Sequence, residues 1–194
     1  MRRFIASFGF LSFLLIACAG DADEPLDCEL KPQISNIPSE TVQVYKMIIH
    51  PSVPGPKVGP IVDAAFEWAT VTSGKFVFEV EYADFDIETK PNHGEMRVYL
   101  GPDPDPKSNV IGTATWWEVD AKGRPTLSQI WIQDNLDPRT HYLTAMHEVG
   151  HAIGLGHSTD NQSIMYPTIH SSGDHPPCVD QQSACKIWEC TPGC

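Results

Sequence analysis

The chain has 194 residues, a length that suits one domain of ordinary size with a single sizeable core. Hydrophobic residues make up 41% of the chain and charged residues 20%, a composition typical of a globular rather than a disordered protein. The formal net charge is −12, so neither a nucleic-acid-binding surface nor a polybasic membrane-binding patch is expected.

The N-terminal segment has the pattern of an export signal. Two arginines precede a short apolar run, FIASFGFLSFLLIA, which is too short for a comfortable membrane span and typical of a signal-peptide core. It ends in LIAC, which resembles the bacterial lipobox, so residues 1–18 are predicted to be a signal peptide and Cys18 a lipid anchor to the cell envelope. The alternative is an ordinary signal peptide, cut near Ala17 or Ala19, and a secreted protein. Residues 19–37 are polar and acidic and are predicted to be a tether.

Hydrophobic periodicity then predicts an α+β domain over residues 38–170. Alternating apolar residues predict strands at residues 41–50, 75–84, 94–101, 110–120 and 126–134. Helical spacing predicts one helix over residues 60–74 and a second over residues 137–156. Asp137 can cap the second helix, Pro138 suits its first turn, and Gly154 or Gly156 can end it.

Cysteines crowd the C-terminal end. After Cys18 the chain contains Cys28, Cys178, Cys185, Cys190 and Cys194. In an exported protein this pattern predicts a small disulfide-stapled tail over residues 171–194, with a connectivity that the sequence leaves open.

The stretch HEVGHAIGLGH, from His147 to His157, has the spacing of a metal site. Residues four apart lie on one face of a helix, so His147 and His151 can both point a ring nitrogen at one ion. Glu148 lies beside the first ligand, where it can take a proton from a bound water. Gly154 allows the chain to leave the helix with an unusual backbone angle, which lets His157 return as the third ligand. A plain helix that happens to carry histidines is the alternative, but it does not explain three of them in one short segment.

This stretch resembles the HExxHxxGxxH signature of metzincin metallopeptidases, and SIMYP, with Met165, resembles the Met-turn of that clan. Ser158 directly after the third histidine points to the matrixin branch, the group similar to matrix metalloproteinases. The resemblance implies a twisted, mixed five-stranded sheet with a long active-site helix. It also implies His147, His151 and His157 as zinc ligands, Glu148 as the general base, and Met165 as a hydrophobic floor beneath the metal.

The implied activity is that of a zinc endopeptidase. Three neutral imidazoles leave the charge of the zinc ion uncompensated, so the zinc-bound water is acidic, and Glu148 assists its attack on a peptide carbonyl. An extended protein or peptide substrate could add as a strand to the antiparallel edge of the sheet, which we assign to residues 109–115. The protein is expected to act as a monomer.

Some positions depart from the matrixin pattern. Ile169 stands where matrixins usually have an aromatic residue that forms a wall of the specificity pocket, so the sequence does not determine the shape of this pocket. Tyr166 is expected to pack or to line the cleft. His93 and His141 are expected to be ordinary surface residues rather than ligands of a second zinc ion. Carboxylates that could bind calcium are those of Asp103, Asp105 and Asp134, although aspartates in Pro-rich loops are usually only solvated.

Three alternatives remain at this point. The chain could be a lipid-anchored surface binding protein that keeps a zinc-stabilised scaffold without turnover, but such a protein has no chemical need for Glu148. It could also hydrolyse another amide, such as one in cell-wall peptide. Finally, the unassigned Cys28 could pair with a tail cysteine, or its thiolate could cover the open zinc position and hold the enzyme latent.

Overall fold

A computed structural model of the chain describes residues 42–103, 109–169 and 173–194. The predicted signal peptide with Cys18, the tether, Cys28 and Asp105 lie outside the described residues. These features therefore stay predictions.

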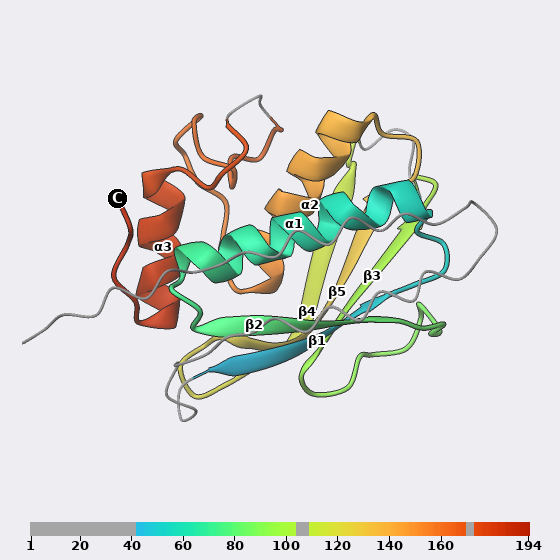
Figure 1. The fold of residues 1–194 in the computed structure, drawn as a ribbon, viewed down its shortest axis with the longest axis horizontal. Helices are drawn as coiled ribbons and strands as arrows, with labels where there is room; N and C mark the ends of the chain where they lie inside the picture. The colour runs from blue at the N-terminus through green and yellow to red at the C-terminus, as the bar shows by residue number, and fades with distance from the viewer. Residues whose placement is uncertain (1–41, 104–108, 170–172) are drawn as a thin grey trace, which may run out of the picture. The chain divides into compact units, whose positions relative to one another are not determined.

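The core of the fold is one mixed five-stranded sheet with the order β2-β1-β3-β5-β4 (Figure 1). The strands are β1 (Gln43–Ile49), β2 (Phe76–Tyr82), β3 (Glu95–Gly101), β4 (Gly112–Val119) and β5 (Pro125–Gln133). Neighbouring strands are parallel except for β4, which pairs antiparallel with β5. The predicted α+β architecture, the five strands and the antiparallel edge are thus confirmed. The edge strand β4 lies within the strand predicted at residues 110–120, and it starts three residues after the narrower edge assigned to residues 109–115.

Helix α1 (Gly55–Val71) begins five residues before its predicted start. Its first turn contains Pro56, whose missing N–H costs nothing where the backbone donors have no helical partner. The helix stops before Ser73 and Gly74, which both adopt positive φ angles. The side chains that α1 buries against the sheet include Ile61, Ala65 and Trp68.

Helix α2 (Pro138–Ala152) carries the motif and packs beside α1 (Figure 1). The indole Nε1 of Trp68 donates a hydrogen bond to the carbonyl of Met146 at 2.8 Å. His141 is fully buried at this contact, with its Nε2 3.1 Å from the carbonyl of Lys57. The surface position expected for His141 is therefore wrong, whereas His93 is exposed as expected. Burial between the two helices lowers the pKa of His141.

The C-terminal segment contains a third helix, α3 (Cys178–Trp188), which the sequence pattern did not predict. Its Trp188 belongs to the same hydrophobic core as the sheet. The ring of Trp188 lies 4.7 Å from that of Phe76, and its Nε1 donates to the carbonyl of Ile153 at 3.1 Å. The stapled tail is therefore packed onto the hydrophobic core of the sheet.

Two disulfides staple this helix, Cys178–Cys194 and Cys185–Cys190. The prediction of disulfides in the tail is confirmed. All four tail cysteines are paired with one another, so this structure leaves no tail cysteine for the alternative in which Cys28 pairs with the tail. The short separations of 16 and 5 residues explain the pairing, because nearby thiols meet at the lowest cost in chain entropy.

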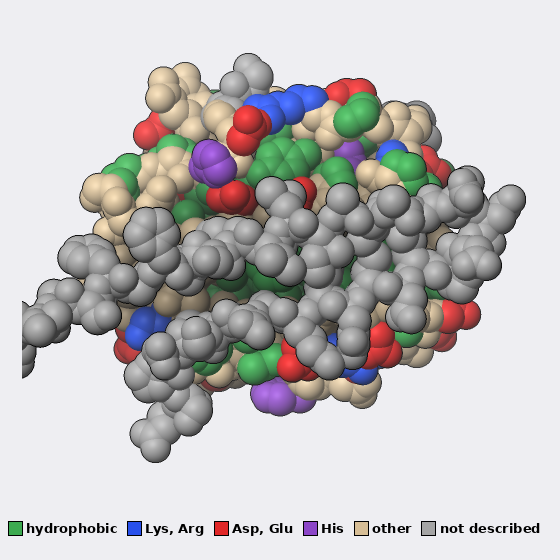
Figure 2. Space-filling view, in the orientation of Figure 1, with side chains coloured by type: hydrophobic (Ala, Val, Ile, Leu, Met, Phe, Trp, Pro, Cys, Tyr) green, Lys and Arg blue, Asp and Glu red, His purple; other side chains and the backbone are tan. Residues whose placement is uncertain are grey.

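None of the helices in the described parts of the chain is long and apolar enough to cross a membrane. On the face shown in Figure 2, the acidic and basic side chains of the described residues are interspersed rather than gathered into patches of one sign.

Candidate metal centre

Helix α2 holds the first two histidines of the motif in a well-defined register. Asp137 caps the helix, since its side chain accepts hydrogen bonds from the backbone N–H groups of Arg139 at 3.0 Å and Thr140 at 3.1 Å. One helical turn separates His147 from His151, and the centroids of their rings lie 4.6 Å apart. Both rings therefore face the same side of the helix.

The chain turns sharply after the helix. Gly154 adopts a φ of +106°, a conformation that side chains strongly disfavour. A Cβ at this position would also lie 3.0 Å from Cδ of Pro125. The N–H of Leu155 donates to the carbonyl of Gly150 at 2.9 Å, which closes the end of the helix. This turn directs the following residues back towards the histidine pair.

The turn brings His157 to the other two histidines. One ligand nitrogen from each of His147, His151 and His157 can be chosen so that all three lie within 4.8 Å of one another. The ring of His157 lies 5.4 Å from that of His147 and 4.7 Å from that of His151. His147 is buried and His157 is exposed, so the cluster is open to solvent on one side.

Backbone carbonyls orient two of the rings. The Nδ1 of His147 lies 2.7 Å from the carbonyl oxygen of Ile164, and the Nδ1 of His151 lies 2.8 Å from that of Leu155. A carbonyl can only accept, so each Nδ1 carries the proton and each Nε2 keeps a lone pair. The two Nε2 atoms are 3.0 Å apart, and two lone pairs at that distance repel unless a cation lies between them.

Electrostatics favour the same state of the rings. Burial lowers the pKa of His147 to about 4 and also lowers the pKa of His151. Both imidazoles are therefore neutral near pH 7, as a metal requires of its ligands. Three imidazoles with an open side match the donor set of a catalytic zinc site.

Glu148 points its carboxylate into a tight space next to the edge strand β4. Its Oε2 is buried and has no hydrogen-bond partner among the described residues. Burial raises the pKa of Glu148 to about 8, and the backbone N–H of Ala114 opposes this shift by donating to the carboxylate. An orphaned buried oxygen is costly in a protein that has no use for it, so this atom points to a chemical role.

Gly112 leaves the space that the carboxylate of Glu148 occupies. The sequence analysis did not identify this glycine as part of the site. A Cβ on Gly112 would lie 2.7 Å from Oε1 of Glu148 and 2.6 Å from Cγ2 of Thr144. A glycine in a strand is a known sign of close approach, but its partner 36 positions away is visible only in the folded chain.

Met165 packs under the histidine helix. It is buried, and a Cβ on Gly150 would collide with its Sδ and lie 3.1 Å from Trp68. The next residue, Tyr166, is half-buried, and its N–H donates to the carbonyl of Ser163 at 3.2 Å. Ile169 is partly buried against the hydrophobic core.

A second network, also missed from the sequence, holds the loop that carries Met165. The carboxylate of Asp180, on α3, accepts hydrogen bonds from the hydroxyl of Ser163 and from the N–H of Ile164. The Oγ of Ser163 in turn accepts from the N–H of Met165 at 2.9 Å. No local pattern marks Asp180, because its partners lie 16 and 17 positions earlier in the chain.

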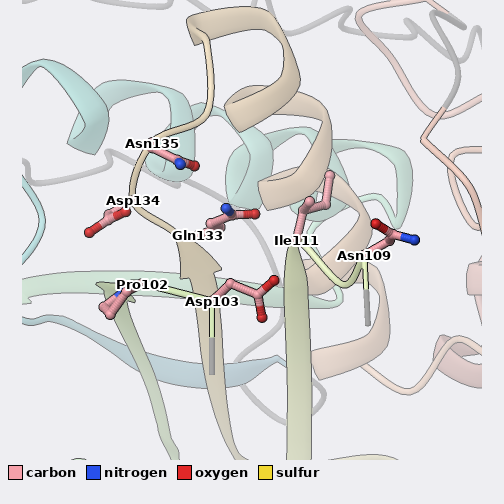
Figure 3. A pocket seen from close by; sticks show the side chains of 7 residues that line it. All are labelled: Pro102, Asp103, Asn109, Ile111, Gln133, Asp134 and Asn135. Atoms are coloured by element: carbon pink, nitrogen blue, oxygen red, sulfur yellow. The ribbon is translucent and has the colours of Figure 1, made fainter. Parts of the chain in front are cut away.

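The aspartates proposed to bind calcium lie elsewhere. Asp103 and Asp134 line a pocket at the ends of β3 and β5, together with Asn109 and Gln133 (Figure 3). Their carboxylates point in opposite directions in this view. Among the described residues, the three histidines form the one group of three or more His, Cys, Asp or Glu side chains that could hold a metal. Calcium binding stays a prediction.

Comparison with known proteins gives a consistent result. The family model described as Matrixin matches residues 40–188. The chain is 29% identical to Metalloendoproteinase 1 of Glycine max over 119 residues, or 56% of this chain and 37% of that protein. It is 46% identical to an interstitial collagenase of Bos taurus over 126 residues, or 60% of this chain and 25% of that protein. Against Metalloendoproteinase 2-MMP of Arabidopsis thaliana the identity is 30% over 126 residues, with 58% and 32% covered. The chain thus spans only 25% to 37% of the length of these relatives.

Proposed function

Because the chain belongs to the matrixin family, we propose that it is a zinc endopeptidase that hydrolyses peptide bonds in extended protein substrates. The observation that carries the proposal is the meeting of three histidine nitrogens, all within 4.8 Å of one another, directly beside a buried glutamate on the same helix. Helical spacing alone brings only His147 and His151 together, and the turn at Gly154, with its φ of +106°, supports the predicted return of His157 to them.

In this proposal His147 and His151 hold the zinc ion through the Nε2 atoms that their backbone carbonyl partners leave unprotonated, and His157 adds the third ring nitrogen. A bound zinc ion supplies Lewis acidity, which makes water a stronger acid and polarises a substrate carbonyl. Gly154 allows the turn that returns His157. Met165 supports the helix from below through its contact with Gly150.

Glu148 is the proposed general base. Burial raises the pKa of Glu148 above its ordinary value, which makes its carboxylate a stronger proton acceptor than that of a solvated glutamate. The N–H of Ala114 holds one side of the carboxylate towards β4, which limits its rotation. From this position Glu148 can take a proton from the attacking water and pass it to the departing amine. Tyr166, half-buried beside Met165, is proposed to line the cleft.

The edge strand β4 is the proposed docking site for the substrate. It has a neighbour, β5, on one side only, so its other edge can pair with an added strand. Glu148 reaches β4 at Gly112 and Ala114, which would bring a paired peptide to the carboxylate. The names of the relatives, a collagenase and two metalloendoproteinases, fit a protein substrate.

Export from the reducing cytosol is also part of the proposal. The two disulfides of the tail support it, because such bonds persist in oxidising compartments. Lipidation at Cys18 is a finer prediction that mass spectrometry of the mature N-terminus can test.

The test of the proposed function is incubation of the full chain with a diverse peptide library, read by mass spectrometry. Internal cleavage that a zinc chelator abolishes and added zinc restores is the expected result. Binding of peptides without any cleavage would overturn the proposal and favour a non-catalytic binding protein. Cleavage that persists at full rate in the chelator would argue against the metal centre.

A further inference from the structure

The edge strand β4 carries an unusual concentration of exposed apolar side chains. Trp116 is 49% exposed, Trp117 43% and Val119 46%, and these are three of the seven large hydrophobic residues exposed in the described part of the chain. An exposed aromatic residue at an open sheet edge invites unwanted association. The exposed Trp116 and Trp117 therefore suggest that this edge binds another molecule.

The backbone of β4 presents its hydrogen-bonding groups to two sides in alternation. The carbonyl of Ile111 accepts from the N–H of Gln133 next to β5, whereas the N–H of Ala114 turns away from β5 to Glu148. By the same alternation, the backbone groups of Gly112 and Trp116 face the open edge with those of Ala114. Regular pairing with β5 continues as far as Trp116 and Ser128, after which the register shifts.

The alternation of side chains along β4 shows on which face of the sheet Trp116 lies. A Cβ on Gly112 would point at Glu148, and Ala114 packs against the hydrophobic core. Trp116, two residues further along the undisturbed register, lies on this same face. The irregularity between Trp116 and Glu118 then ends the regular edge, as β-bulges next to active sites often do.

We infer that Trp116 is a specificity-determining residue, which selects substrates with an aromatic or large apolar side chain two to four positions from the scissile bond. This inference rests on the proposed peptidase function. A peptide paired along residues 112–116 reaches Glu148 at one end and the indole of Trp116 at the other. Successive same-face side chains lie about 7 Å apart along a strand, which gives the spacing of two to four residues.

The experiment uses one parent peptide with Phe, Leu, Ser or Lys placed at each position from two to four residues on either side of the bond. The values of kcat and KM are compared for wild type, Trp116→Ala, Trp116→Phe and Tyr82→Ala. Tyr82 is the matched control, because it is an exposed aromatic residue on the opposite edge strand, β2. We expect wild type to prefer Phe over Ser about tenfold at one position, the order that a single aromatic contact supplies.

In Trp116→Ala this preference should fall to about twofold or less, chiefly through KM, while Trp116→Phe and Tyr82→Ala keep it. An unchanged preference in Trp116→Ala would overturn the inference and leave the proposed function standing. A wild-type dimer that Trp116→Ala dissociates, without any change in preference, would also overturn it and assign the surface to a second copy of the chain.

Binding separates the inference from the proposed function. The affinities of the same peptides are measured by fluorescence anisotropy for two variants, Glu148→Ala and the double variant Glu148→Ala with Trp116→Ala. The Glu148→Ala change keeps the peptides uncleaved. If wild type cleaves none of the peptides but binding still depends on Trp116 and on the aromatic residue, the selectivity holds and the peptidase function fails. Equal affinities for the Phe and Ser peptides would overturn the inference.

Discussion

The carboxylate of Asp180 lies 2.7 Å from the backbone nitrogen of Ile164, and the carbonyl of the same Ile164 accepts the Nδ1 proton of His147 at 2.7 Å. One residue thus joins the stapled helix α3 to a proposed zinc ligand. Asp180 is only 1% exposed, so water does not compete for these bonds. Its carboxylate therefore positions the loop that orients His147.

Replacing Asp180 with asparagine should weaken zinc binding. The variant keeps the size of the side chain but presents at most one acceptor oxygen to the N–H of Ile164 and the hydroxyl of Ser163. Outer-shell changes of this kind typically cost about 10- to 100-fold in metal affinity, and we expect the lower end because Asp180 acts through a peptide group. Competition with a fluorescent zinc chelator measures the change.

Asp160→Asn is the matched control for this variant. Asp160 is an exposed aspartate before the same loop, and its carboxylate accepts from the N–H of Gln162 at 2.9 Å. Zinc affinity should stay within about twofold of wild type in this control. Equal losses in the two variants would contradict a specific role for Asp180.

The stability of the protein should depend on the ionisation of Asp180. Burial raises the pKa of Asp180 in the folded state above its ordinary value of 3.8. Between 3.8 and that raised pKa the folded state holds more protons than the unfolded state, so the free energy of unfolding falls as pH rises. The difference in this free energy, wild type minus Asp180→Asn, should decrease across that window and become level above it. Urea unfolding at a series of pH values tests this, and a difference that grows with pH would contradict it.

Replacing Glu148 with glutamine should separate metal binding from turnover. Glutamine has nearly the same shape but cannot accept a proton at neutral pH, so peptide hydrolysis should fall by about 10²- to 10⁴-fold. The three histidines are unchanged, so zinc content, measured by atomic absorption, should stay near one ion per chain. Exposed Glu189 supplies the control, Glu189→Gln. Near-normal turnover in Glu148→Gln would remove Glu148 from the mechanism.

Adding one methyl group at Gly112 should harm activity more than folding. The new Cβ would lie 2.7 Å from Oε1 of Glu148, so the carboxylate has to move. We expect kcat to fall about 10- to 100-fold, since misplacement by about 1 Å can cost that much, with a loss of about 1–3 kcal/mol in unfolding free energy. Steady-state kinetics and urea unfolding measure the two effects.

Gly59→Ala provides the comparison for Gly112. A Cβ at Gly59, inside α1, meets nothing within 4 Å. Alanine is a better helix former than glycine by about 1 kcal/mol, but a Cβ just before Pro60 is disfavoured in helical backbone, so this variant should be fully active with an unfolding free energy within about 1 kcal/mol of wild type. If Gly112→Ala keeps the kcat of wild type as Gly59→Ala does, the close approach of residue 112 to Glu148 does not matter for activity.

Local features of the sequence were sufficient wherever the determining interactions are themselves local. The alternating residues of β1 to β5 predicted the strands, and Asp137 predicted the start of α2, because cap hydrogen bonds reach only two or three residues. The four-residue spacing predicted that His147 and His151 share a face, since helix geometry is set by neighbouring residues. The family resemblance supplied the mixed five-stranded sheet with an antiparallel edge strand, which periodicity alone does not contain, and the structure added the strand order.

The tertiary structure decided what depends on residues far apart in the chain. It placed Gly112 against Glu148, Asp180 against Ile164, and Trp188 in the core against Phe76. It also buried His141 and paired the tail cysteines among themselves. Each of these contacts depends on loop closure and packing across the whole domain, which no short window of residues encodes. The sequence thus determined which groups can bind a metal and move a proton, while the packing of β4 and α3 around α2 decided how those groups are oriented.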